Sequence, residues 1–249
     1  MNGSFAIARG KESIIGTFLP IGRPLMIGLV VLAAYVPAFA QNAELQQKLA
    51  GVEQAIAENK QRLQQYQWIE TTQLTLKGDP KPPTQDSCQY GPDGKVQKTP
   101  IGPPPEQPRG GRLKQRVVEK KRGEMQEYMG EVKGLLSLYV PPDPQKMEQA
   151  KQAGKVSLNP VGGVVNLVFR DYAQPGDQMT LSFDTAARKV TSLNVNTYMG
   201  ETKDMVTLQV QMASLPDGTN YVQRTVLTAT AKHLEATTTN SNYQKLGGV

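Results

Sequence analysis

Apolar and polar residues alternate along much of the second half of this sequence. In residues 179–184, Met179, Leu181 and Phe183 take every second position and polar residues stand between them. Because successive side chains of a β-strand point to opposite faces, this period predicts strands with one apolar face, as in an antiparallel sheet packed on one side. Six such segments, separated by short turn sequences, are expected at 164–172, 179–184, 190–198, 205–213, 221–231 and 234–243.

The stretch at 43–66 follows a helical period instead. Its apolar residues, from Leu45 to Leu63, recur at alternating spacings of four and three, and Asn59 stands where the series is interrupted. Gln, Glu, Lys and Arg fill most other positions, which predicts an amphipathic helix with one apolar stripe. That stripe needs a partner surface, which is either the protein's own sheet or a second chain.

Between these two regions the pattern changes several times. A Thr-rich alternation predicts a first strand at 67–76, and a Gly-Pro-Asp-Gly turn at 91–94 predicts a hairpin within 84–101. Five prolines predict an exposed loop at 100–111, because proline donates no ladder hydrogen bond. Two helices are expected within 112–153, with Asp143 as the N-cap of the second and Pro144 as its first residue.

Together these elements predict an α+β fold. We expect a curved antiparallel sheet of about seven strands, an open half-barrel, covered by amphipathic helices. An N-terminal amphipathic helix at 41–66 is followed by a single domain at 67–249. Trp68, in the first strand, is expected to anchor the core rather than to form a sugar-stacking platform.

The first forty residues carry the features of an export signal. Several cations precede an apolar run at 25–36, which is followed by the small residues Ala38 and Ala40 and by polar Gln41. The apolar run is too short to span a bilayer, which takes roughly twenty residues. We therefore expect residues 1–40 to be a cleaved secretory signal. The mature protein would have no transmembrane segment and would lie in the periplasm or outside the cell.

Composition limits the chemistry available to this protein. The 249 residues carry a formal net charge of +6, with one cysteine and one histidine. A single cysteine excludes an intramolecular disulfide, and neither His233 nor Cys88 stands in a pattern typical of a catalytic base, a nucleophile or a zinc site. Cys88 is expected either to be buried or to form a mixed disulfide. We predict no enzymatic activity, no cofactor, no metal and no catalytic residues.

Positive charge is concentrated in one segment, at 109–122. Only Glu119 opposes its cations, and such a run can attract anionic lipid headgroups or other polyanions. The alternative is that the run only solvates the start of a helix. Nucleic acid is disfavoured because the protein is expected to be exported. The seven cations are Arg109, Arg112, Lys114, Arg116, Lys120, Lys121 and Arg122.

The order of these elements resembles that of the periplasmic lipoprotein-carrier superfamily. The shared features are an export signal, an amphipathic helix, early strands with Trp and Thr, an inserted helical stretch and a long meander with Met and Leu on its inner face. The resemblance covers most of residues 43–243. It implies an unclosed barrel, lidded by helices, that can hold acyl chains, and it identifies no particular ligand-contacting residue.

Two functional hypotheses follow. The first is a non-enzymatic envelope protein that binds an apolar ligand or a lipidated partner in a groove between sheet and helices. The second is a structural or protein-interaction module of the envelope that uses the N-terminal helix and the basic segment at 109–122. The two differ in whether the space beneath the helices is empty or filled by the Met and Leu side chains of the meander.

Overall fold

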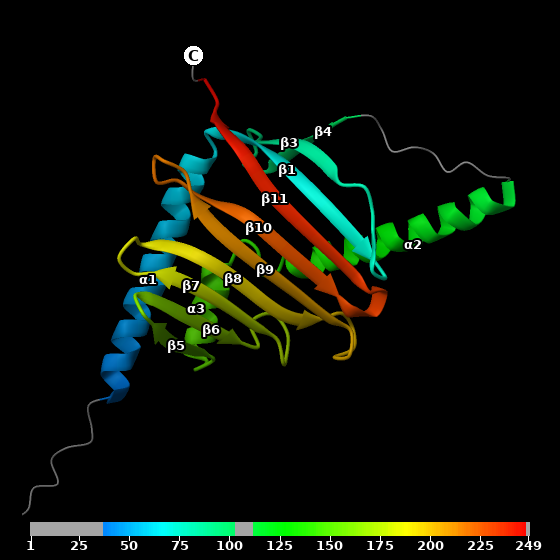
Figure 1. The fold of residues 1–249 in the computed structure, drawn as a ribbon. Coiled ribbons are helices and arrows are strands. Elements are labelled where there is room, and N and C mark those ends of the chain that lie inside the picture. Colours follow the sequence, from blue (N-terminus) through cyan, green and yellow to red (C-terminus); the bar gives the residue numbers. More distant parts are fainter. Residues whose placement is uncertain (1–36, 103–111, 248–249) are drawn as a thin grey trace, which may run out of the picture.

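The computed structural model describes residues 37–102 and 112–247, and within these ranges the chain forms three α-helices and eleven strands. The strands form one antiparallel sheet in the order β4-β3-β1-β11-β10-β9-β8-β7-β6-β5, with β2 paired to β1. The sheet does not close into a barrel, and β4 and β5 lie at its opposite edges (Figure 1). The elements are α1 (Pro37–Leu63), β1 (Tyr66–Leu76), β2 (Asp79–Pro80), β3 (Thr84–Tyr90), β4 (Val96–Ile101), α2 (Arg112–Leu136), α3 (Pro144–Gln152), β5 (Val156–Val161), β6 (Val164–Arg170), β7 (Gln178–Asp184), β8 (Lys189–Tyr198), β9 (Met205–Ser214), β10 (Asn220–Ala229) and β11 (Leu234–Lys245).

Strands β5 to β11 form a continuous meander in which each strand pairs with the next. β1 lies beside β11, with Leu74 opposite Ala236, so the first long strand of the chain pairs with the last. β3 and β4 extend the sheet on the other side of β1. Segments from the two ends of the described chain are therefore neighbours in one sheet.

The sheet has more strands than the sequence predicted, since about seven were expected and the described residues contain eleven. Nine of the eleven correspond to segments named from the sequence, more than the seven expected for the sheet. The two that were not named are β2, which has two residues, and β5, in which Pro160 interrupts the strand pattern. β5 is an edge strand, where a missing N–H need not break a ladder. Pro100 likewise lies in the edge strand β4, so the loop expected at 100–111 begins only after Ile101; residues 103–111 lie outside the described part.

The helices agree with their sequence signals best at the start of α3. Asp143 caps this helix as predicted, because its Oδ1 accepts a hydrogen bond from Gln145 N–H at 2.9 Å. α1 ends at Leu63, so Tyr66 belongs to β1 rather than to the helix expected to reach it. The predicted signal at 1–40 lies outside the described residues except for its last four, which belong to α1.

All three helices pack on the same face of the sheet (Figure 1). Val52 of α1, Val132 of α2 and Met147 of α3 are buried in one core with the inward-facing residues of the strands. In β6 and β7 every second residue is buried, as the alternation predicted. The predicted α+β fold, an open antiparallel sheet covered by helices, is therefore confirmed.

A buried carboxylate fixes the connection between α2 and α3 over the sheet. Asp177 accepts hydrogen bonds from the backbone N–H groups of Tyr172, Ala173 and Gln174, at 2.6, 2.9 and 2.8 Å. The hydroxyl of Tyr139, in the α2–α3 connection, also donates to Asp177. Burial raises the pKa of Tyr139 far above its ordinary value, so this hydroxyl keeps its proton. The next residues of the connection are thereby held beside α1.

Candidate functional site

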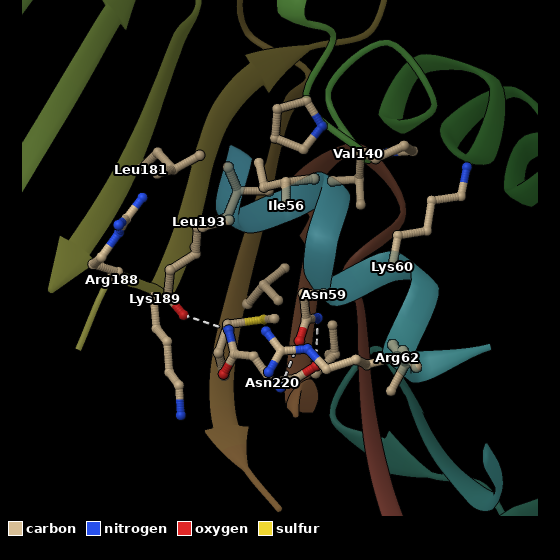
Figure 2. Close-up of a pocket in the computed structure, with 18 of the residues that line it drawn as sticks. Ile56, Asn59, Lys60, Arg62, Val140, Leu181, Arg188, Lys189, Leu193 and Asn220 are labelled. Carbon is tan, nitrogen blue, oxygen red and sulfur yellow. Dashed lines mark hydrogen bonds between the residues drawn. The ribbon is translucent and has the colours of Figure 1, made fainter. Parts of the chain in front are cut away.

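A groove opens between the C-terminal half of α1 and the inner face of the sheet (Figure 2). Its volume is about 490 Å³, which falls within the roughly 300–1,000 Å³ typical of small-molecule sites. α1 forms one wall, and strands β7 to β10 form the floor. The turn between β3 and β4 and the α2–α3 connection form the remaining sides. We call this space the α1 groove.

The groove begins where α1 stops packing closely on the sheet. Leu45, Leu49 and Val52 are buried in the core, whereas the next residues of the same apolar stripe, Ile56 and Leu63, are only half-buried and line the groove. The stripe predicted from the sequence therefore has two roles. Its first part holds the helix on the sheet, and its last part faces open space.

The floor of the groove consists of aliphatic side chains from four consecutive strands. Leu181, Leu193 and Val210 are nearly buried, while Met212 and Val222 are half-buried. Other Met and Leu side chains of the meander fill the core. The meander thus packs most of its apolar face in the core, and on the groove floor Met212 and Val222 remain partly uncovered.

The two remaining sides of the groove are also largely apolar. Tyr90 and Val96 come from the β3–β4 hairpin, and Val140 and Pro142 come from the α2–α3 connection. Val96 and Val140 are among the large apolar side chains that are exposed. Exposed apolar surface beside a groove is typical of a binding site.

Asn59 joins α1 to the sheet at the edge of the groove. Its Nδ2 donates to the carbonyl of Asn220 at 2.7 Å, and its Oδ1 accepts from Asn220 N–H at 2.6 Å. The Asn220 side chain in turn donates to the carbonyl of Val190 at 2.7 Å. The interruption of the apolar stripe at Asn59 was visible in the sequence, but its partner was not.

Four cationic side chains lie around the groove, and none of them was predicted from the sequence to be functional. Lys60 and Arg62 belong to α1, whereas Arg188 and Lys189 lie at the turn between β7 and β8. Arg188 Nη2 donates to the side-chain oxygen of Gln54 at 3.1 Å, and Lys189 Nζ donates to Ser214 Oγ at 3.0 Å. These partners are neutral and leave the positive charges uncompensated.

Trp68 lies in an aromatic cluster next to the groove. Its ring stacks on Tyr243 with centroids 5.5 Å apart and lies 5.6 Å from the ring of Tyr90, which lines the groove. Tyr221 continues the cluster, 4.4 Å from Tyr243. Burial raises the pKa of Tyr90 and of Tyr243. Trp68 is buried, as expected of a core anchor, and the cluster supports one wall of the groove.

The residues with potentially reactive side chains lie elsewhere. Cys88 pairs with Trp68 in the ladder and is buried, which raises the pKa of its thiol, so the first of the two expectations for it holds. His233 is exposed in the tight turn before β11. Among the described residues there is no group of three or more His, Cys, Asp or Glu side chains suited to a metal ion.

Among the described residues, the part of the predicted basic segment at 112–122 does not line the groove. The N-terminal half of α2 extends away from the sheet (Figure 1). Arg109 lies outside the described residues, and of Arg112 and Lys114 only the backbone is described. The exposed cations on this part of the helix are Arg116, Lys120, Lys121 and Arg122.

Fold and groove define an α+β protein with a large open antiparallel sheet and an apolar space under one helix. No protein-family model matches the sequence, and no curated protein matches it. Among solved structures the chain is similar to a DUF1329 family protein from Desulfovibrio piger ATCC 29098, with 8% identity, a TM-score of 0.39, and coverage of 80% of this chain and 93% of that one. This distant likeness does not confirm the resemblance to the lipoprotein-carrier superfamily. No helix within the described ranges is long and apolar enough to cross a membrane.

Proposed function

We propose that this protein binds the hydrocarbon chain of a lipid or of a lipidated partner in the α1 groove, without catalysis. The observation that carries the proposal is the groove itself, about 490 Å³ of space whose floor and sides are mainly aliphatic. A hydrocarbon chain that enters such a space gains about 0.8 kcal/mol for each methylene removed from water. Met212 and Val222, half-buried on the floor, would be covered by it.

The lining of the site favours a hydrocarbon chain over a ligand recognised by many hydrogen bonds. Contact surfaces come from Ile56 on the helix, Val210 on the floor and Val140 on the α2–α3 connection, so the apolar lining continues along several elements. Each of these side chains adds apolar contact area but no hydrogen-bonding group that would fix the orientation of a ligand. Such a lining selects for hydrophobicity and length rather than for a pattern of hydrogen bonds.

Native mass spectrometry of the delipidated protein with palmitate tests the proposal. We expect one bound palmitate on the wild-type protein. Met212→Trp, which places a large side chain on the groove floor, should abolish binding, whereas Gln211→Trp, on the exposed neighbouring position of β9, should leave it unchanged. A wild-type protein that binds no palmitate, or a Met212→Trp variant that binds as well as the wild type, would refute the proposal.

The cell envelope is the compartment we propose for this activity. Its basis is the predicted signal at 1–40, which ends at Ala40 before polar Gln41. Mass spectrometry of the protein from an envelope fraction should give a mature N-terminus at Gln41. Absence of the protein from the envelope fraction, or an intact N-terminus on the protein recovered there, would contradict this assignment.

The projecting half of α2 favours a second candidate function, docking on an anionic membrane surface. Lys120, Lys121 and Arg122 are exposed on a helix that extends from the sheet (Figure 1). Each cation near such a surface contributes about 1 kcal/mol at low ionic strength. The wild-type protein should sediment with phosphatidylglycerol vesicles and not with phosphatidylcholine vesicles. Replacing the three cations with Gln should release it, and binding that survives this change would count against the candidate.

A further inference from the structure

The charges around the α1 groove are of one sign. Lys60, Arg62, Arg188 and Lys189 all contribute to its lining, and among the described residues that form it there is no Asp or Glu. None of the ion pairs between described residues involves these four cations. The described part of the groove is apolar and its only charges are positive and without counter-charges. It is therefore complementary to an amphiphile with an apolar chain and an anionic headgroup.

Two of the cations lie on either side of Asn220, at one end of the groove. Figure 2 shows the Arg62 side chain extending from the end of α1 toward Asn220, while Lys189 lies across the groove, at the turn between β7 and β8. Arg188 extends toward Leu181 and donates a hydrogen bond to Gln54, and Lys60 extends toward Val140. The groove therefore has a basic end, which we define by Arg62 and Lys189.

The two carboxylates in the turns nearest to this end already have partners, and Glu58, four residues before Arg62 on α1, accepts a hydrogen bond from Gln54 Nε2 at 2.7 Å. Asp217, beside the turn of β9 and β10, accepts from the Tyr66 hydroxyl at 2.6 Å and lies 3.3 Å from Lys245 Nζ. Asp184, at the end of β7, accepts from the backbone N–H groups of Ala186 and Ala187, each at 2.9 Å. Asp217 and Asp184 are engaged in their own turns, and neither they nor Glu58 line the groove.

We infer that the ligand of the α1 groove is an anionic amphiphile whose oxyanion headgroup, a carboxylate or a phosphate, lies between Arg62 and Lys189. The Arg62 guanidinium presents several N–H donors to such an oxyanion, and the Lys189 ammonium can approach the headgroup from the facing side. The hydrocarbon chain then extends over Leu193 and Met212 beneath α1. This inference rests on the proposed hydrocarbon binding and adds the chemistry of the headgroup and its direction in the groove.

Four probes of equal chain length separate charge from hydrophobicity: palmitate, hexadecyl phosphate, hexadecanol and hexadecylamine. At neutral pH we expect palmitate and hexadecyl phosphate to bind about ten-fold or more tightly than hexadecanol, because each exposed cation contributes a few-fold. Hexadecylamine should bind most weakly. The relative affinity of the two anions ranks carboxylate against phosphate as headgroups for this site.

Variants of the two cations test the position of the headgroup. In the Arg62→Gln, Lys189→Gln double variant the preference for palmitate over hexadecanol should disappear while the affinity for hexadecanol stays unchanged. Lys60→Gln, a cation of the same groove that extends elsewhere, should keep the preference. A double variant that keeps its preference, or a Lys60→Gln variant that loses it, would overturn the assignment.

The failure of this inference can be told apart from failure of the proposed function. If the wild-type protein binds hexadecanol as tightly as palmitate, the groove binds the hydrocarbon chain and its affinity does not depend on the charge of the headgroup. In that case the inference fails and the proposed function stands. If none of the four probes binds, both fail. Circular dichroism of each variant shows whether the fold is intact, and the retained hexadecanol affinity serves as a second check.

Discussion

Replacing Asn59 with alanine tests how α1 is held at the edge of the groove. The side chain exchanges two hydrogen bonds with the backbone of Asn220, at 2.7 and 2.6 Å, and Asn220 is only 7% exposed. A hydrogen bond of this kind contributes about 1 kcal/mol, and the backbone groups left behind lose a partner in a partly buried site. Water in the adjoining groove can replace part of the loss. The free energy of unfolding should therefore fall by about 2 kcal/mol.

Urea denaturation at fixed pH measures this change. A loss of that size, divided by a slope of about 2–3 kcal/mol per M, moves the unfolding midpoint down by about 0.7–1 M without changing the slope. Gln61→Ala is the matched control, since Gln61 is exposed on the same helix. An exposed substitution of this kind changes stability by less than about 0.5 kcal/mol.

Asn59→Leu distinguishes the hydrogen-bonded role from a simple gap in the apolar stripe. If the position only lacked an apolar side chain, leucine would stabilise α1 by completing the series of four and three. The two hydrogen bonds to Asn220 predict the opposite, a loss similar to that of Asn59→Ala. A stabilised Asn59→Leu protein, or an Asn59→Ala protein as stable as the Gln61→Ala control, would refute the reasoning.

Three further predictions follow from other contacts. The hydrogen bond from Tyr66 is the main cause that holds the pKa of Asp217 well below its ordinary value. The ionised carboxylate therefore stabilises the folded protein above about pH 4, and this stabilisation is lost as the pH falls. The stability difference between wild type and Asp217→Asn, measured by thermal unfolding, should shrink below pH 4; a constant difference down to about pH 2 would contradict this. Tyr139→Phe removes the buried hydroxyl that donates to Asp177 and should cost about 1–3 kcal/mol in urea unfolding, whereas an unchanged midpoint would exclude the contact. Cys88 should react with a thiol reagent only after unfolding, and rapid modification of the native protein would show that it is accessible.

The elements that were predicted correctly are those whose signal is local. β7 buries one face, so its period of two is visible in six residues, and the cap of α3 needs only Asp143 and the N–H of Gln145. β5 was not predicted because Pro160 argues against a strand unless the segment is known to lie at the edge of a sheet. Whether a strand lies at an edge depends on the pairing of the whole sheet, so it cannot be inferred from the sequence of that strand alone.

The groove could not be located from the sequence because it depends on contacts between distant segments. Asn59 and Asn220 are 161 residues apart, and no local pattern links them. Met212 and the buried Leu208 both lie on the inward-facing positions of β9. The position of α1 over the sheet determines that Leu208 is buried and that Met212 faces the groove. Arg188 and Lys189 look like ordinary turn residues until α1 is placed across from them.

The pairing of β1 with β11 sets the order in which this protein can complete its sheet. Gln67 and Gln244 are partners in the ladder between β1 and β11, although they lie 177 residues apart in the sequence. During synthesis one edge of β1 therefore has no partner until β11 has been made. Contacts of such long sequence separation form slowly, because a large loop must close before they contribute. β1 therefore keeps one unpaired edge for as long as β11 is missing, and the pairing of these two strands completes the sheet.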